Sequence, residues 1–561
     1  MNATLLATTV KAAAVSDRLH VPPIRYLAIA PPMILIGGAV VLLAVASLVS
    51  RPLRVRVSTI GSIIVAGTAL GISIWQWADV AKHGAHTYVA HAVVMDGFSV
   101  LVTMLISAAM VVTALIADGY LTREGIEGAE FHVLALVSAS GAMLMGLAND
   151  LIIVFLGLEI LSIALYVLTA FNHRRAASGE AALKYFLLGG FSSAIFVYGI
   201  ALTYGATGST NLTQIADFLS KNVILSNGLL LAGLALMLVG FAFKIAAVPF
   251  HMWTPDVYEG APSPVTGFMA AVAKVGAFAA LLRVLVSSLG TITTDWQPII
   301  YALAVLSLVL GSVLALRQRD VKRMLAYSSI NHAGFILLGV ESATARGVSS
   351  ALYYLVAYTF MTLGSFAIIT VLGREGDGDH DLTRYRGLAK RQPLLALAFA
   401  ILLLAQAGAP FTTGLWAKLQ VVLATISSGA VPLAVIAMVT AAIAAFFYLR
   451  VAVLMYAGGE AAEAAEGADG DTQPVPTEHG TAAGWATPES VSGSVTTLNA
   501  QLLLTEEEAP ATGETVPSVV KVPALTSLAI GLCLAVTVIF GLAPAPLLDF
   551  ANHATLLFLG H

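Results

Sequence analysis

The sequence has few of the residues on which soluble enzymes and metalloproteins depend. Among its 561 residues there is one cysteine, Cys533, and only 11% are charged, against roughly 25% in an ordinary soluble domain. A single thiol cannot by itself form a disulfide framework, a zinc ribbon or a cysteine-ligated iron–sulfur cluster. The sequence also lacks a Gly-x-x-x-x-Gly-Lys-Ser/Thr loop and a Gly-x-Gly-x-x-Gly fingerprint. It therefore gives no indication that this chain binds a nucleotide.

The hydrophobic content is correspondingly high. Apolar residues make up 58% of the chain, and the mean hydropathy is +0.88. About 20 apolar residues cross a bilayer as one helix. The sequence therefore predicts an all-α polytopic membrane protein with about fourteen spans, at 31–49, 57–78, 95–117, 131–148, 151–171, 179–204, 228–254, 263–287, 297–316, 324–340, 347–372, 393–426, 431–456 and 522–543.

Lysine and arginine are distributed unevenly among the loops between these spans. Sixteen lie in one set of alternate loops, and six lie on the opposite side, which includes the N-terminal tail. Because basic loops stay in the cytoplasm, both termini are predicted to be extracytoplasmic. Residues 1–28 contain no continuous apolar segment before the first span, so we expect no cleaved signal peptide.

The segment 457–521 differs from the rest of the chain. It contains eleven acidic residues between Glu460 and Glu514, many Ala, Gly, Thr and Pro residues, and one basic residue at its end. Low hydrophobicity combined with like charge predicts a flexible, acidic cytoplasmic linker that has no core of its own.

Two spans that lie five helices apart are interrupted by proline. Pro249 follows Lys244 in the seventh span, and Pro410 precedes Lys418 in the twelfth. Proline removes a backbone donor and frees carbonyls, and a pair of such broken helices is typical of inverted-repeat transporters. The predicted organisation is three N-terminal helices (1–130), two inverted five-helix repeats (131–290 with spans 4–8, and 291–456 with spans 9–13), the linker (457–521) and a C-terminal helix (522–561).

Six titratable side chains interrupt the apolar spans, namely Glu159, Lys184, Lys244, Lys274, His332 and Lys418. An ammonium at bilayer depth costs from about 3 to over 10 kcal/mol, so such residues tend to be functional. Burial favours the neutral form of lysine and a nearby carboxylate favours the charged form. These lysines therefore suit proton transfer better than sodium binding, which would need clustered carboxylates, hydroxyls and carbonyls. We expect Glu159 to contact Lys244. We also expect Lys274, His332 and Lys418 to define one hydrated route between the repeats.

Structural interpretations compete with a proton-transfer role for several of these residues. Glu159 could belong to a structural ion pair, and Lys184 could extend its ammonium to the membrane surface. His332 could be a packing histidine, although it ends the polar run Tyr327-Ser-Ser-Ile-Asn-His332, which could carry protons.

Other charged residues have simpler interpretations. Arg283 and Arg450 lie near span ends and are interpreted as interfacial anchors. The segment Asp377-Gly-Asp-His-Asp381 lacks the acidic twelfth residue of a calcium loop, so it is interpreted as solvated loop.

One segment carries a specific family resemblance. Residues 244–269, KIAAVPFHMWTPDVYEGAPSPVTGFM, closely resemble the antiporter-like membrane subunits of proton-pumping NADH:quinone oxidoreductase (respiratory complex I). The stretch Val257-Tyr-Glu-Gly-Ala-Pro262 is similar to the subunit N branch. The resemblance extends to Arg323–His332, to Tyr385-Arg-Gly-Leu-Ala389 and to the break before Lys418. The linker departs from the family pattern, which usually has a short loop at that place.

The resemblance implies a proton-translocating subunit of a bacterial inner-membrane translocase. In that family the corresponding residues form a proton-input half, here Glu159, Lys244 and Lys274, and an output half, here Lys418. No cofactor is expected on this chain. FMN, iron–sulfur clusters and quinone are expected on the other membrane-arm and peripheral-arm subunits, and no nucleic acid is expected as a partner.

Two other function classes share some of these features. A subunit of a multisubunit cation/proton antiporter would have the same lysines and broken helices, but the Tyr258-Glu-Gly-Ala-Pro262 stretch argues against it. A cofactor-free scaffold, in which charges only hold helices together, is disfavoured by the four lysines within apolar spans.

Overall fold

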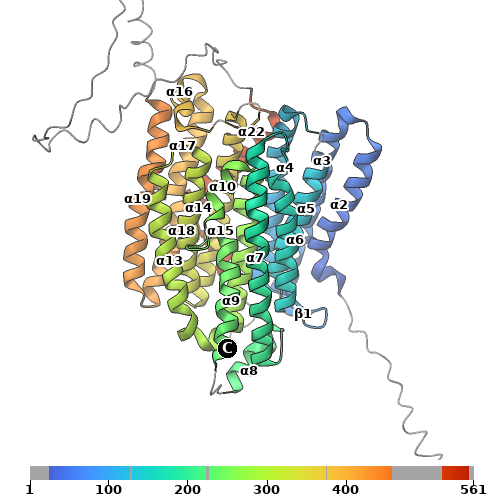
Figure 1. Ribbon diagram of the computed structural model, residues 1–561, viewed down its shortest axis with the longest axis vertical. Helices are drawn as coiled ribbons and strands as arrows, with labels where there is room; N and C mark the ends of the chain where they lie inside the picture. The colour runs from blue at the N-terminus through green and yellow to red at the C-terminus, as the bar shows by residue number, and fades with distance from the viewer. Residues whose placement is uncertain are drawn as a thin grey trace, which may run out of the picture.

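The computed structural model of the chain describes residues 25–126, 129–222, 227–373, 376–378, 380–457 and 521–554. Long helices run side by side and form one bundle (Figure 1). Apart from its two end residues, the predicted linker 457–521 lies outside the described residues, so its flexibility stays a prediction.

The N-terminal part consists of helices joined by one short hairpin. A single turn, η1 (Tyr26–Ile29), leads into α2 (Ala30–Leu48), which is followed by α3 (Arg51–His83). Strands β1 (His86–Tyr88) and β2 (Val93–Met95) pair antiparallel, with His86 opposite Met95, and lead into α4 (Gly97–Glu124). Asp96 caps α4 because its carboxylate accepts a hydrogen bond from the Ser99 N–H.

Two groups of helices with a broken member follow in the chain. The first comprises α5 (Ala129–Leu147), α6 (Leu151–Thr169), α7 (Ala176–Thr207), α8 (Leu212–Lys221), α9 (Gly228–Ile245), α10 (Trp253–Gly260), α11 (Ser263–Phe268), η2 (Met269–Ala273), α12 (Lys274–Leu282), η3 (Arg283–Ser288) and η4 (Gly290–Ile292). The second comprises α13 (Thr293–Leu316), α14 (Val321–Glu341), α15 (Ala345–Leu372), η5 (Leu382–Tyr385), α16 (Leu388–Arg391), α17 (Pro393–Ala407), α18 (Thr413–Ser427) and α19 (Val431–Tyr456). Helices α22 (Ala524–Leu542) and α23 (Ala545–His553) end the described chain.

Within the described ranges, twelve helices are long and apolar enough to cross a membrane. The two other predicted spans correspond to α14 and to the pair α17 and α18. Helix α14 is long but carries the polar run up to His332, and α17 and α18 are two half-helices separated by a break. The predicted count of fourteen therefore stays a prediction, whereas the all-helical membrane architecture is confirmed.

Both predicted helix breaks are confirmed. Helix α9 ends at Ile245, and Ala246 turns the chain with a φ of 61° before α10 begins at Trp253. Helix α17 ends at Ala407, and Gly408 turns the chain with a φ of 94° before α18 begins. Pro249 and Pro410 lie inside these interruptions, where no helical donor is required of them.

The eighth span is the most deeply buried of the bundle. Every residue in its central 18-residue window lies inside the protein. It is not a regular α-helix, because η2 and η3 are π-helical turns on either side of α12. Such turns occur frequently at functional sites, and here η2 ends at the residue before Lys274. The sequence pattern did not predict these turns.

Arg283 is not an interfacial anchor, so that interpretation was wrong. Its guanidinium donates to both carboxylate oxygens of Asp96, at 2.9 and 3.0 Å, and its Nε donates to the Gly146 carbonyl at 3.2 Å. Both charged side chains are almost completely buried. A bidentate pair satisfies the planar guanidinium where a lone charge would be costly. Arg450 lies exposed, and its NH1 donates to the Leu316 carbonyl at 3.1 Å.

Asp377 is not part of a solvated loop, so that interpretation was wrong too. The side chain is fully buried, and its carboxylate lies 3.5 Å from Lys322 Nζ. It accepts hydrogen bonds from the Ser263 N–H at 2.8 Å and from His380 Nε2 at 2.9 Å. Burial alone would raise the pKa of the Asp377 carboxyl, but Lys322, His380 and the Ser263 N–H together hold it well below its usual range.

Replacing Asp377 by Asn should destabilise the protein by about 3–5 kcal/mol at pH 7, because Lys322 loses its buried counter-charge. The native contribution is complete above about pH 4 and decreases as the pH falls further, since the folded-state pKa lies below that of the unfolded chain. Thermal unfolding of the detergent-solubilised protein measures the effect. Asp381→Asn is the matched control, because Asp381 only caps η5 and asparagine caps equally well. Equal losses in both variants would contradict the prediction.

Candidate site of buried lysines

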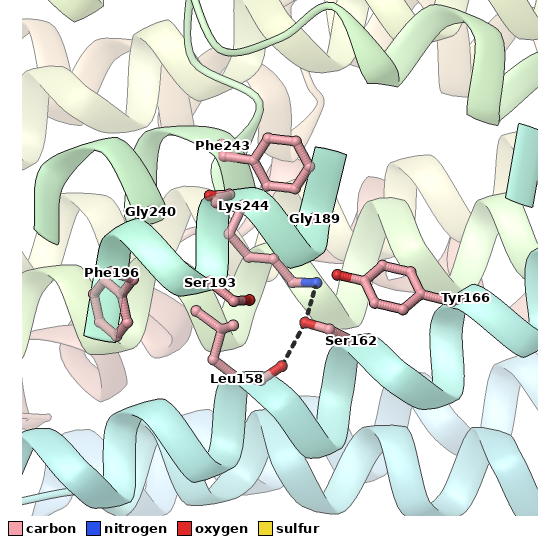
Figure 2. A pocket seen from close by; sticks show the side chains of 10 residues that line it. Leu158, Ser162, Tyr166, Gly189, Ser193, Phe196, Gly240, Phe243 and Lys244 are labelled. Atoms are coloured by element: carbon pink, nitrogen blue, oxygen red, sulfur yellow. Dashed lines mark hydrogen bonds between the residues drawn. The ribbon is translucent and has the colours of Figure 1, made fainter. Parts of the chain in front are cut away.

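Lys244 lies at the end of α9 and points between α6 and α7. Its Nζ donates to Ser162 Oγ at 2.8 Å and to the Tyr185 hydroxyl at 3.2 Å. Figure 2 shows the ammonium beside a small pocket, with the Tyr166 hydroxyl also directed toward it. A Cβ on Gly189 would lie 2.0 Å from that hydroxyl, so glycine is what leaves room for Tyr166.

Glu159 is not the direct partner of Lys244, so the prediction that they pair is wrong. The oxygen that meets the ammonium belongs to Ser162, three residues further along α6. One carboxylate oxygen of Glu159 is buried and has no hydrogen-bond partner among the described residues. Its charge still attracts that of Lys244 through space. Glu159 thus lies near Lys244, but the hydrogen bonds of the Lys244 ammonium go to neutral oxygens.

Lys184 lies apart from the buried lysines. Its side chain is 44% exposed, and its Nζ lies 2.8 Å from Glu180 and 2.9 Å from Asp256. Asp256 also binds Arg323, which in turn binds Glu259. These contacts form an exposed ion-pair network that connects α7, α10 and α14. They favour the interpretation of Lys184 as a side chain that extends to the surface.

Lys274 is held against the polar face of α14. Its Nζ donates to the Ser329 carbonyl and hydroxyl oxygens at 2.5 and 2.6 Å. The same hydroxyl accepts from Tyr358 at 2.8 Å and lies 3.2 Å from the Tyr258 hydroxyl. The ammonium also lies 5.0 Å from the centre of the Tyr358 ring, which adds cation–π attraction.

His332 lies one turn further along α14 and contacts two tyrosines. Its Nδ1 is 2.7 Å from the Tyr354 hydroxyl, and its Nε2 is 3.1 Å from the Tyr448 hydroxyl. Tyr448 forms a further short hydrogen bond with Ser328. The imidazole is completely buried, yet both ring nitrogens have hydroxyl partners, as a packing histidine or a proton carrier equally requires.

Lys418 uses the second helix break directly. Its Nζ donates to the carbonyl of Ala407 at 2.7 Å, the last residue of α17. The C-terminus of a helix carries partial negative charge and unpaired carbonyls, both of which favour a cation. The ammonium also lies 5.0 Å from the centre of the Phe335 ring, on the helix that carries His332.

Among the described residues four lysines are buried, and the three other than Lys322 share one kind of partner. Lys244, Lys274 and Lys418 are 5%, 3% and 6% exposed, and the hydrogen-bond acceptors of their ammonium groups are hydroxyl or carbonyl oxygens. The structure brings Lys274, His332 and Lys418 around the same stretch of α14. It places Lys244 beside α6, where Glu159 lies.

The tyrosines of the site were missed by sequence reasoning. Tyr185, Tyr258, Tyr354, Tyr358 and Tyr448 come from four different helices. A tyrosine in an apolar span is common and costs little free energy to bury, so none of these tyrosines alone indicated a functional site. The pairing of Tyr354 and Tyr358 one turn apart on α15 was the only pattern available.

Comparisons with known proteins agree with one another. The family model described as NADH:quinone oxidoreductase/Mrp antiporter, TM, matches residues 148–444. NADH-quinone oxidoreductase subunit N 2 of Roseiflexus castenholzii is 43% identical over an alignment of 456 positions, gaps included, which covers 79% of this chain and 90% of that protein. The subunit N of Acidothermus cellulolyticus is 38% identical over an alignment of 564 positions, gaps included, which covers 97% of this chain and 98% of that protein. The chain belongs to the NADH-quinone oxidoreductase subunit N family.

Solved structures show the same fold. A chain of the respiratory complex I of Thermus thermophilus superposes with a TM-score of 0.70 at 30% identity, covering 93% of this chain and 99% of that one. A chain of the Mrp complex from Dietzia sp. superposes with a TM-score of 0.76 at only 21% identity, covering 95% and 98%. The second likeness shows the shared fold alone.

Ser329→Ala should slow NADH-driven proton pumping about tenfold or more, because Lys274 loses one of its two acceptors and two tyrosine hydroxyls lose their shared partner. A hydrogen bond to a charged group contributes about 1.5–3 kcal/mol. Ser312→Ala is the control, since Ser312 is equally buried but bonds only to carbonyls of its own helix. Pumping is measured in inverted membrane vesicles; equal rates in the two variants would contradict the prediction.

Proposed function

We propose that the chain moves protons across a bacterial inner membrane as subunit N of an NADH:quinone oxidoreductase. NADH oxidation and quinone reduction would take place on partner subunits, which would hold FMN, the iron–sulfur clusters and the quinone. The observation that carries this proposal is the set of three buried lysines bound to neutral oxygens. Two of them lie beside helix breaks, and the third follows a π-helical turn.

Neutral acceptors matter because of what they allow a lysine to do. A carboxylate at contact distance favours the ammonium strongly and would keep the proton in place. A hydroxyl or carbonyl stabilises the ammonium less, so the energies of the charged and neutral forms lie closer together in a buried site. A serine or tyrosine hydroxyl can also donate to the neutral amine after the proton has left. Such lysines can release and accept protons.

The scaffold alternative is disfavoured by a contrast within the chain. Where the described part of the protein uses buried charge to join helices, it pairs a cation with a carboxylate, as in Arg283 with Asp96 and Lys322 with Asp377. The three site lysines have no such pairing.

The order of the groups supports a division into two halves. Lys244, with Glu159 and the Tyr185 hydroxyl, would form the input half together with Lys274. His332 with its two tyrosines would connect Lys274 to Lys418, the output residue. In the domain organisation proposed from the sequence, residues 131–290 would carry the input lysines and residues 291–456 would carry His332 and Lys418. We further propose that both termini are extracytoplasmic, as the distribution of basic loops indicates.

Lys418→Arg tests the proposal most directly. Arginine keeps the positive charge but cannot release its proton in a protein, so proton pumping should be abolished while insertion and assembly are preserved. Lys418→Met, which is apolar and of similar length, should also abolish pumping. The measurement is NADH-driven acidification of inverted vesicles at matched complex content. Wild-type pumping by Lys418→Arg would contradict a role in which this lysine deprotonates.

Glu159→Gln should lower proton pumping more than it lowers electron transfer from NADH to a soluble artificial acceptor. The substitution removes the carboxylate charge that attracts Lys244 without changing the size of the side chain. Both activities are measured on the same membranes. An equal loss of both, or normal pumping, would count against a functional role for Glu159.

A further inference from the structure

The C-terminal helix α22 packs against the second helix break. The chain reaches α22 only after the acidic segment, and α22 then lies against α4, α15 and α18. Near its C-terminal end, Gly541 contacts the interruption between α17 and α18. A Cβ at this position would lie 2.3 Å from the Phe411 carbonyl oxygen and 2.4 Å from Thr412 Cα. The helix therefore approaches the backbone of the break more closely than any side chain would permit.

A hydrogen bond from α18 also holds Gly541 against the break. Trp416 Nε1, in the first turn of α18, donates to the Gly541 carbonyl at 2.9 Å. Lys418 lies two residues further along α18. The break is thus connected to α22 through backbone contact at Phe411 and Thr412, and through the indole of Trp416.

At the first break, the tryptophan bonds within its own span. There the indole of Trp253 donates to the Phe243 carbonyl at 3.0 Å, so the two half-helices of one span are joined to each other. The Val248 N–H donates to Ser307 Oγ at 3.0 Å, on the helix that follows the eighth span. In both breaks a tryptophan N–H donates to a backbone carbonyl near a helix end, but in the second break the carbonyl belongs to α22.

We infer that Gly541 and Trp416 are positioning residues for proton transfer at Lys418. Through them, α22 sets the distance between the end of α17 and the start of α18. That distance decides whether the Ala407 carbonyl reaches the Lys418 ammonium, a contact that is 2.7 Å long. The inference rests on the proposed role of Lys418 and adds that the second site is completed by the C-terminal helix.

The geometry explains why adding a single methyl group at Gly541 should displace the backbone of the second break. The atoms that a new Cβ would meet are backbone atoms of Phe411 and Thr412, which cannot move away by changing a rotamer. The segment between Gly408 and Thr413 has to shift instead. A misplacement of about 1 Å in a positioned group can cost about a hundredfold in rate.

The test compares glycine substitutions in the intact complex. Gly541→Ala should reduce NADH-driven proton pumping about tenfold to a hundredfold. It should also move the alkaline limb of the pumping pH profile to lower pH, because the ammonium form of Lys418 loses a carbonyl acceptor. Trp416→Phe, which removes only the N–H donor, should move the limb in the same direction by less. Electron transfer from NADH to an artificial acceptor should be unchanged in both.

Two controls, one on α22 and one on the facing helix α4, separate positioning from general packing. Gly531→Ala lies on the exposed side of the same helix, where a Cβ meets nothing within 4 Å. Gly119→Ala crowds the opposite end of α22, at Pro523 and Thr526. Both should retain the wild-type pH profile. The inference is overturned if Gly541→Ala and Trp416→Phe keep the wild-type profile, or if Gly119→Ala shifts it equally.

These outcomes are separate from those of the proposed function. If Lys418→Arg pumps normally, the proposed role of Lys418 fails whatever the glycine variants do. If Lys418→Arg is inactive while Gly541→Ala and Trp416→Phe behave as wild type, only the positioning role of α22 fails. If Gly541→Ala does not assemble, Trp416→Phe alone decides between the two results.

Discussion

An ammonium group inside a membrane must be met by oxygen atoms, and much of this bundle is arranged to meet that requirement. Lys244 uses hydroxyls from α6 and α7, Lys274 uses a serine of α14, and Lys418 uses the last carbonyl of a half-helix. Each solution demands an irregular or polar feature that the bilayer would otherwise disfavour. Irregular backbone at this depth is tolerated because it is covered by protein. The breaks and the polar face of α14 are thus consequences of placing lysines at this depth.

The two buried ion pairs serve a different purpose from the lysines. The eighth span begins at Ser263, whose N–H is bound by Asp377, and its last turns contain Arg283, which is bound by Asp96. Both ends of the helix that carries Lys274 are therefore fixed by carboxylates from other parts of the chain. Between these fixed ends, the π-helical turn η2 ends at the residue before Lys274, whereas η3 begins at Arg283 itself. Buried carboxylates hold both ends of the span, and the lysine between them is bound by neutral acceptors.

The sequence predicted the features that depend on local composition. The helical architecture followed from apolar runs, and the breaks followed from Pro249 and Pro410 beside lysines. It failed where the outcome depends on which helices meet. Asp377 looked solvated because its neighbours in sequence are polar, yet the fold places it against Lys322 and Ser263. Glu159 and Ser162 lie on the same face of α6, one turn apart, and only the packing of the helices decides that the Lys244 ammonium reaches Ser162. The tyrosines of the site were not predicted because their role, too, depends on which helices pack together.

The contact between Trp416 and Gly541 joins residues 125 positions apart, which has a consequence for biosynthesis. The first break is joined by Trp253, so its stabilising hydrogen bond is available soon after that part of the chain is made. The second break must wait for the last long helix, which at about 5–20 residues per second arrives roughly 6–25 s after Trp416 leaves the ribosome. A nascent chain therefore holds one finished lysine site and one unfinished site during insertion. The hydrogen bond between Trp416 and Gly541 can form only when the final helix has entered the membrane.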